Sequence, residues 1–173
     1  MLYPSGTPTQ PEMITLALSK LHLKPADVFA DIGCGSGSVS IAAASMVKHV
    51  YAIDNRDEAV RAADHNIKEC GIRNVSVLKG DAASVLTDID IDCAFVGGSK
   101  NIEQVLALLI KKGARFVVSA VRIETAVLAL GILKKNNRFR EIMQIQLSRG
   151  HELGGGTMFK PENPVFLILG GTC

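Results

Sequence analysis

The sequence is poor in cysteine, histidine and aromatic residues. Its 173 residues include four cysteines, four histidines, two tyrosines and six phenylalanines, with no tryptophan. The cysteines form no CxxC pair and the histidines show no metal-ligand spacing, which argues against a structural zinc site and a disulfide framework. No basic run is interleaved with aromatic residues. We therefore expect no bound metal, no nucleic-acid partner and a reducing compartment.

Long hydrophobic runs are also missing. No apolar segment reaches the length of a membrane span, and the start of the chain has neither a basic n-region nor an apolar h-region. We therefore expect a cytoplasmic protein without a membrane partner. A length of 173 residues and a hydrophobic content of 47% fit one domain, residues 1–173, with a single sizeable core.

The small formal charge of +2 hides an asymmetry along the chain. Residues 1–99 contain 8 Lys or Arg and 12 Asp or Glu, whereas residues 100–173 contain 11 and 5. The basic excess either solvates helix ends or forms a surface that faces an anion. The sequence leaves both alternatives open.

Short apolar runs alternate with helical patterns along most of the chain. The runs predict buried strands at 28–32, 50–53, 75–78, 93–96 and 116–120. Helices are predicted at 11–21, 38–46, 57–70, 101–111 and 124–136. This alternation is typical of an α/β protein with a doubly wound parallel sheet.

The tail breaks the alternation. Two strand-like runs, 141–147 and 165–169, are joined by a segment with no room for a crossover helix, so they should pair antiparallel. A seven-stranded, mostly parallel sheet with a reversed C-terminal hairpin resembles the class I S-adenosylmethionine-dependent methyltransferase fold, which is Rossmann-like. Fold alone does not give function.

The loop after the first predicted strand indicates which class of nucleotide-like ligand the protein binds. It reads D-x-G-x-G-x-G from Asp31 to Gly37, whereas a dinucleotide loop needs a third glycine where Ser38 stands. A triphosphate loop needs a lysine that this segment lacks. The string resembles the first motif of S-adenosylmethionine methyltransferases, although a structural turn, with Asp31 as a helix cap, is the alternative.

Two acidic positions strengthen this interpretation. Asp54 ends the second strand, where the family binds both ribose hydroxyls, and Asp81 and Ala82 follow the third strand, where the family holds the adenine. The resemblance implies S-adenosyl-L-methionine as cofactor, bound by Thr9, Asp31, Gly33, Cys34, Gly35, Ser36, Gly37, Asp54, Asp81 and Ala82.

The methyl acceptor is suggested by other strings. The fourth strand is followed by "GGSK" rather than by the paired prolines and aromatic ring of enzymes that methylate an amino group on a flipped base. "PTQPEMITL" (8–16), "GGS" (97–99) and "SRGHELGGGTMFKPENPVFLI" (148–168) resemble the cobalt-precorrin methyltransferase and decarboxylase family of anaerobic vitamin B12 synthesis. The C-terminal domain of the fused precorrin-6Y enzyme is similar. Two family cations are absent here, where Gln10 and Ile14 stand.

This resemblance implies methylation of cobalt-precorrin-6B at carbon 15 and loss of carbon dioxide from the carbon 12 acetate. The tetrapyrrole would be bound by Gly97, Ser99, Lys100, Arg122 and Arg149. His151 and Glu152, placed in a loop near the site, are candidates for proton delivery, although a solvent-exposed turn explains them equally well.

Alternatives remain open at this point. The chain could be a methyltransferase acting on RNA or another small molecule, or a non-catalytic S-adenosylmethionine-binding module. The family resemblance also implies a homo-oligomer, with a tetramer as one candidate, in which the apolar strand at 165–171 could pack between chains.

Overall fold

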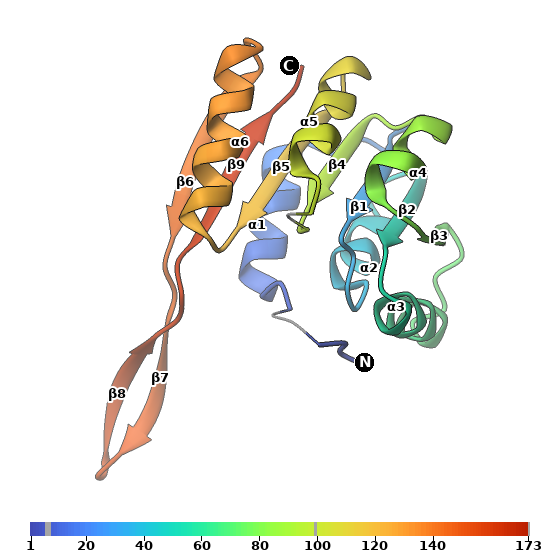
Figure 1. Cartoon of the computed structure of the whole chain (residues 1–173). Helices are drawn as coiled ribbons and strands as arrows, with labels where there is room; N and C mark the ends of the chain where they lie inside the picture. Colours follow the sequence, from blue (N-terminus) through green and yellow to red (C-terminus); the bar gives the residue numbers. More distant parts are fainter. Residues whose placement is uncertain (6–7, 99, 173) are drawn as a thin grey trace.

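The computed structural model describes residues 1–5, 8–98 and 100–172 (Figure 1). Its helices are α1 (Pro11–Leu21), α2 (Ser38–Ala44), α3 (Asp57–Glu69), α4 (Ala82–Asp88), α5 (Ile102–Lys111) and α6 (Ile123–Lys135). Its strands are β1 (Val28–Ile32), β2 (His49–Asp54), β3 (Val75–Lys79), β4 (Cys93–Val96), β5 (Arg115–Ala120), β6 (Phe139–Ile145), β7 (Ser148–Leu153), β8 (Gly156–Pro161) and β9 (Val165–Gly170).

Seven strands form one sheet in the order β3-β2-β1-β4-β5-β9-β6. The pairs from β3 to β5 are parallel, and β9 runs antiparallel to both of its neighbours, β5 and β6. The predicted fold and the antiparallel pairing in the tail are thereby confirmed.

Helices cover both faces of the sheet. α4, α5 and α6 pack on one face, where Ala30 and Ile32 of β1 contribute to the core. α1 and α2 pack on the other face against residues such as Phe29 and Phe95, and α3 covers β2 beside them. Because β1 and β4 are buried on both faces, their sequences read as continuous apolar runs rather than as alternating ones.

Local signals explain where several helices begin and end. Pro11 stands in the first turn of α1, a position that needs no backbone N–H donor. The sequence analysis did not predict α4, which Asp81 begins by accepting a hydrogen bond from the backbone N–H of Ser84 at 3.3 Å. Lys111, Lys134 and Lys135 lie in the last turns of α5 and α6, which favours the helix-end explanation of the basic excess.

The segment between β6 and β9 is a β-hairpin, so its expected loop conformation is wrong. β7 and β8 pair from Ser148 opposite Pro161 to Leu153 opposite Gly156. The two linking glycines, Gly154 and Gly155, both have positive φ, as a tight type I′ turn requires. Every residue of the hairpin is exposed, and the hairpin extends away from the body of the chain (Figure 1).

The end strand also differs from expectation. β9 lies inside the sheet, between β5 and β6, and Leu167, Ile168 and Leu169 are buried there. It therefore cannot pack between chains as the sequence analysis suggested. No helix in the described part of the chain is long and apolar enough to cross a membrane.

Candidate active site

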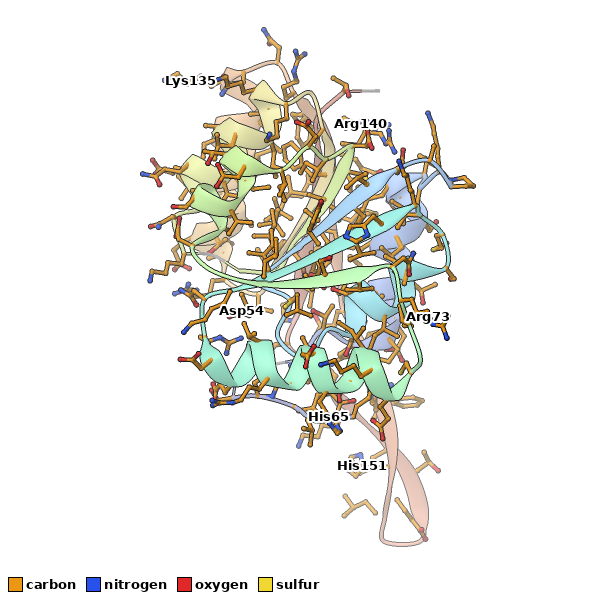
Figure 2. The ribbon with its side chains drawn as sticks, turned by 90° about the vertical axis from the view of Figure 1, so that its right-hand side faces the viewer. Asp54, His65, Arg73, Lys135, Arg140 and His151 are labelled. Atoms are coloured by element: carbon orange, nitrogen blue, oxygen red, sulfur yellow. The ribbon has the colours of Figure 1, made fainter. Side chains whose placement is uncertain are left out.

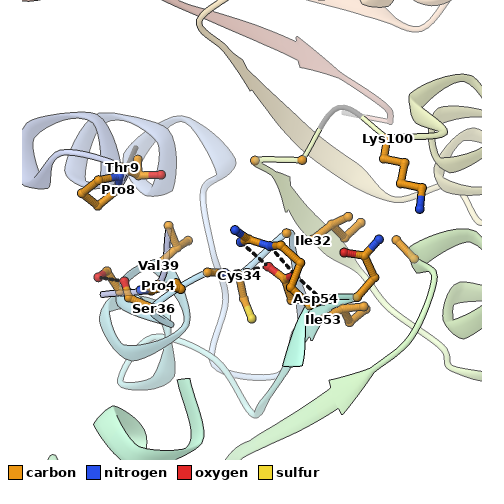
Figure 3. Close-up of a pocket in the computed structure, with 18 of the residues that line it drawn as sticks. Pro4, Pro8, Thr9, Ile32, Cys34, Ser36, Val39, Ile53, Asp54 and Lys100 are labelled. Carbon is orange, nitrogen blue, oxygen red and sulfur yellow. Dashed lines mark hydrogen bonds and ion pairs between the residues drawn. The ribbon is translucent and has the colours of Figure 1, made fainter. Parts of the chain in front are cut away.

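A pocket of about 380 Å³ lies at the carboxyl ends of β1 to β4 (Figure 3). Its lining comes from residues 3–5 and 8–9 ahead of α1, the loop after β1, the end of β2, the turn after β3 and the loop after β4. In parallel α/β sheets, ligands bind at this edge. Predicted site residues in the lining are Thr9, Gly33, Cys34, Gly35, Ser36, Asp54, Asp81, Ala82, Gly97 and Lys100.

The glycine loop approaches two neighbouring strands closely. The backbone N–H groups of Gly33 and Cys34 both donate to the Ile53 carbonyl, at 2.8 and 3.0 Å. Gly33 has φ +78°, and a Cβ atom there would lie 2.7 Å from the backbone nitrogen of Gly98. Only glycine therefore allows this loop to pack against the loop that follows β4.

Gly37 lies behind the pocket rather than in its lining. It is the N-cap of α2 and has φ +78°. A Cβ atom there would lie 3.3 Å from the Cα and Cβ atoms of Ala63 in α3. Its role in this structure is the close packing of α2 against α3.

Asp31 lies beneath the glycine loop, fully buried and outside the pocket lining. Its Oδ2 atom accepts hydrogen bonds from the backbone N–H and the hydroxyl of Ser40, at 3.0 and 2.6 Å, which caps the first turn of α2. Its Oδ1 atom has no hydrogen-bond partner among the described residues. Burial raises the pKa of Asp31 to about 7, although the Ser40 hydrogen bonds oppose the increase. The neighbouring Cys34 thiol, which does line the pocket, also has a pKa raised by burial.

Asp54 presents its carboxylate at the end of β2. It accepts hydrogen bonds from the backbone N–H of Gly35 at 3.1 Å and from the backbone N–H of Arg56 at 3.0 Å. The Arg56 guanidinium adds two more, from Nε to Oδ1 and from Nη2 to Oδ2, each at 3.1 Å (Figure 3). Burial alone would raise the pKa of Asp54, but these hydrogen bonds outweigh burial and hold the pKa below its ordinary value.

The turn after β3 contributes a second carboxylate. Asp81 accepts a hydrogen bond from the side-chain amide of Asn101 at 2.9 Å. This bond, together with the capping bond from Ser84, lowers the pKa of Asp81. The carboxylate is therefore ionised at neutral pH, on the side of the pocket where Ala82 begins α4.

The loop after β4 forms another wall of the pocket. The backbone N–H groups of Gly97 and Gly98 both donate to the Ile32 carbonyl, at 2.8 and 3.2 Å. Lys100 lines the pocket a few residues later. Ser99, predicted to bind substrate, lies outside the described residues. Arg122, from the same prediction, is the exposed N-cap of α6 and does not line the pocket.

Arg149 is bonded to other side chains of the protein. Its guanidinium donates to both carboxylate oxygens of Glu12, at 3.0 and 3.1 Å, to the side-chain oxygen of Gln10 at 2.9 Å, and to Glu162 at 3.2 Å. Gln10 also donates to Glu162 at 2.7 Å. This network joins the start of α1 to the base of the hairpin. Ile14, the other position that departs from the family pattern, is buried in the core.

His151 and Glu152 do not reach the pocket of their own chain. Both lie in β7, opposite Met158 and Thr157 of β8. Figure 2 shows His151 on the hairpin, well separated from Asp54. The structure therefore does not bring these two residues together with the predicted cofactor site.

The sequence analysis missed several pocket residues, of which Arg56 makes the most contacts. Besides Asp54, its guanidinium donates from Nη1 to the Ser5 carbonyl at 2.7 Å and lies 3.9 Å from Glu58. Tyr3 and Pro4 belong to the same arm and line the pocket with Ser5. Arg56 follows the strand-ending Asp54 by two residues, a spacing at which a carboxylate commonly binds the local backbone. That signal was present in the sequence.

Comparisons with known proteins show the family to which the chain belongs. Residues 3–169 match the family described as the precorrin methyltransferase domain. The chain is 50% identical to a protein of Methanosarcina mazei named as a probable cobalt-precorrin-6B C(15)-methyltransferase (decarboxylating), over 96% of this chain and 94% of that protein.

Solved structures with a similar fold include one that is named as a precorrin decarboxylase. The crystal structure of a precorrin 8W decarboxylase from Methanobacterium thermoautotrophicum is similar, with a TM-score of 0.90 and 35% identity over 98% of this chain and 94% of that one. An S-adenosylmethionine-dependent O-methyltransferase from Thermotoga maritima shares the fold, with a TM-score of 0.77 and 17% identity over 97% of this chain and 68% of that one. With a family match across residues 3–169 and a curated relative of 50% identity, this chain belongs to the precorrin methyltransferase family.

Proposed function

We propose that this protein transfers a methyl group from S-adenosyl-L-methionine to carbon 15 of cobalt-precorrin-6B and removes carbon dioxide from the carbon 12 acetate, as a step in cobalamin biosynthesis. The observation that carries the proposal is the pocket in which the glycine loop meets Asp54, in a chain of the precorrin methyltransferase family. The Methanosarcina mazei relative is named for this reaction.

The pocket residues fit the cofactor. The volume of about 380 Å³ lies within the range of about 300–1,000 Å³ that is usual for small-molecule sites. Asp54 would hold the ribose, and Asp81 and Ala82 the adenine. The backbone from Gly33 to Ser36 would hold the amino-acid portion, with Gly37 supporting that loop from behind and Thr9 covering it from the arm. Asp31 would act from beneath the loop, through the Ser40 hydrogen bonds that hold the first turn of α2, rather than by contact with the cofactor. When bound, the cofactor supplies an electrophilic methyl group.

The loop after β4 suits a wide, flat acceptor. Gly97 and Gly98 leave this wall of the pocket without side chains, so a macrocycle can approach closely. Lys100 supplies a cation for the peripheral carboxylates of a tetrapyrrole. Because the acceptor carbon is enamine-like, the main task of these residues is to hold it in line with the methyl group. Arg122 and Arg149 remain candidates for substrate binding, and Arg149 would first have to leave Glu12 and Glu162.

The decarboxylation needs orientation and one proton. The bond between the acetate methylene and its carboxylate breaks, carbon dioxide leaves, the conjugated macrocycle accepts the electron pair, and a proton completes the methyl group. His151 and Glu152 remain our candidates for delivering that proton. Since the hairpin extends away from the body of its own chain (Figure 1) and contributes no residue to the pocket lining, they would act on the pocket of a neighbouring copy. Full decarboxylation by both His151→Ala and Glu152→Ala would exclude the role.

We infer a homo-oligomer, with a tetramer as the candidate assembly, in the cytoplasm. The exposed hairpin supports self-association. A two-stranded ribbon with no covered face is at best marginally stable in water. This ribbon exposes Leu153, Met158 and Phe159, the last with 72% of its surface accessible. Contact with a second copy would remove that apolar surface from water.

Mass spectrometry tests the proposed reaction. The purified protein is incubated anaerobically with S-adenosyl-L-methionine and cobalt-precorrin-6B. A product that has gained one methyl group and lost one carbon dioxide supports both activities on this chain. An unchanged macrocycle, with S-adenosyl-L-methionine still bound by the protein, would contradict the substrate and direct attention to RNA or another small molecule as acceptor. The absence of any binding would contradict the cofactor as well.

A further inference from the structure

The Asp54 carboxylate is surrounded by hydrogen-bond donors of its own chain. The backbone N–H groups of Gly35 and Arg56 and two nitrogens of the Arg56 guanidinium donate to it, all at 3.0 to 3.1 Å. A carboxylate offers about four acceptor positions. The four donors therefore fill the positions that a ribose diol would use.

Two of these donors cannot move independently of the fold. The Gly35 N–H is fixed by the glycine loop, whose first two N–H groups bind the Ile53 carbonyl. The Arg56 N–H belongs to the N-cap residue of α3. The guanidinium, in contrast, ends a flexible side chain that is 42% exposed, whereas the Asp54 side chain is only 4% exposed. A ribose that binds Asp54 can therefore displace only the guanidinium.

We propose that Arg56 determines the affinity of the nucleoside site, because its guanidinium occupies the acceptor positions of Asp54 that the ribose hydroxyls require and withdraws when a nucleoside binds. This inference rests on the proposed function, which makes the ligand a nucleoside. The structure also supplies a second partner for the displaced side chain. Glu58, in the first turn of α3, lies 3.9 Å from Nη1 of Arg56.

The withdrawal of Arg56 also alters the arm that lines the pocket. The planar guanidinium bonds Asp54 through Nε and Nη2 and the Ser5 carbonyl through Nη1. A rigid plane cannot turn away from the carboxylate and keep all three bonds. The arm keeps other anchors, because Leu2 exchanges hydrogen bonds with the Asn66 side chain at 2.6 and 2.8 Å. Nucleoside binding is thus coupled to the arm at Ser5, whose hydroxyl also donates to Glu58.

Calorimetric titration with S-adenosylhomocysteine tests this inference on the full chain. The test variant, Arg56→Met, keeps the apolar stem and removes the guanidinium, and Arg61→Met removes an exposed arginine of the same helix outside the pocket lining. The apparent affinity is proportional to the fraction of molecules in which the guanidinium leaves the Asp54 carboxylate available, so a smaller fraction means weaker binding. A half-exposed bidentate ion pair is weak enough that Arg56→Met should bind about three- to tenfold more tightly than the wild type. Arg61→Met should match the wild type.

A second ligand separates this role from a general change in the pocket. The 2′,3′-dideoxy analogue of S-adenosylhomocysteine has no ribose hydroxyls, so Arg56→Met and the wild type should bind it equally. If the wild type binds S-adenosylhomocysteine as tightly as Arg56→Met does, or more tightly, the inference is overturned and the proposed function stays intact. Failure of all three proteins to bind would instead refute the proposed cofactor, and the inference with it.

Discussion

Replacement of the buried Asp31 by asparagine should remove a pH dependence of stability. The native pKa of Asp31 is raised by burial to about 7, against an ordinary value of 3.8. Between about pH 4 and pH 7, the Asp31 carboxyl is ionised in the unfolded chain but stays protonated in the native protein. The contribution of Asp31 is therefore fully present below about pH 4, decreases as pH rises, and is lost above about pH 7.

The magnitude follows from the difference between the two pKa values. Each pKa unit corresponds to about 1.4 kcal/mol, so the total loss is about 4 kcal/mol, of which about 3 kcal/mol falls between pH 4.5 and 8. An asparagine side chain at this position would keep an acceptor for Ser40 and cannot ionise. The Asp31→Asn variant should therefore match the wild type near pH 4.5 and exceed its free energy of unfolding by about 3 kcal/mol at pH 8.

Urea denaturation of both proteins at a series of pH values measures this difference. Asp90→Asn is the control, because it makes the same chemical change at a fully exposed side chain. Parallel profiles for Asp31→Asn and the wild type would mean that Asp31 is ionised in the native protein throughout the range. The argument from burial would then be refuted.

Three further predictions concern the loop, the ribose contact and the hairpin. Gly33→Ala should lower the free energy of unfolding by about 2–4 kcal/mol, because the added Cβ would meet the Gly98 nitrogen. Gly35→Ala, whose added Cβ has no neighbour within 4 Å, should lower it by only about 1 kcal/mol through backbone strain. Equal shifts of the melting temperature for the two variants would contradict the close approach at Gly33. Asp54→Asn should weaken S-adenosylhomocysteine binding about ten- to a hundredfold in calorimetry, because charge and one acceptor are lost; an unchanged Kd would exclude the ribose role. Phe159→Ser should reduce the molar mass measured by light scattering, and an unchanged mass would show that the hairpin tip does not hold copies together.

Most of the fold could be predicted because its central strands, such as β1 and β4, are buried on both faces. β1 and β4 were predicted with the observed bounds, as was α1, and the alternation of strands and helices fixed the sheet type. α4 was missed because it is short and buries only Ala83 and Leu86, too few positions to show a helical period. The hairpin was missed although a pair of glycines between strand-like residues was its signal.

The comparisons confirm the family resemblance, which depends mainly on the string at residues 148–168. This segment has a different conformation from the loop that was expected. Residues 148–168 form β7, β8 and most of β9. We placed this segment beside the substrate as a loop, but its first part is an exposed hairpin. Similarity of a string therefore identified the family without identifying the position of its side chains.

Sequence predicts the residues of the cofactor part of the pocket better than those of the proposed substrate part. Strand ends and glycine conformations are local properties, so the rule that ligands lie beyond parallel strands placed Gly33, Asp54 and Asp81 at one pocket. The partners of a long cationic side chain depend on tertiary contacts. Arg149 meets Glu12 across 137 positions of sequence, which no local pattern encodes. Arg56 is the intermediate case: its spacing from Asp54 is local, but its bond to Ser5 becomes visible only once the arm is placed against α3. A cation after a strand therefore indicates the edge where a ligand binds, whereas the carboxylate that it contacts decides whether it is available to that ligand.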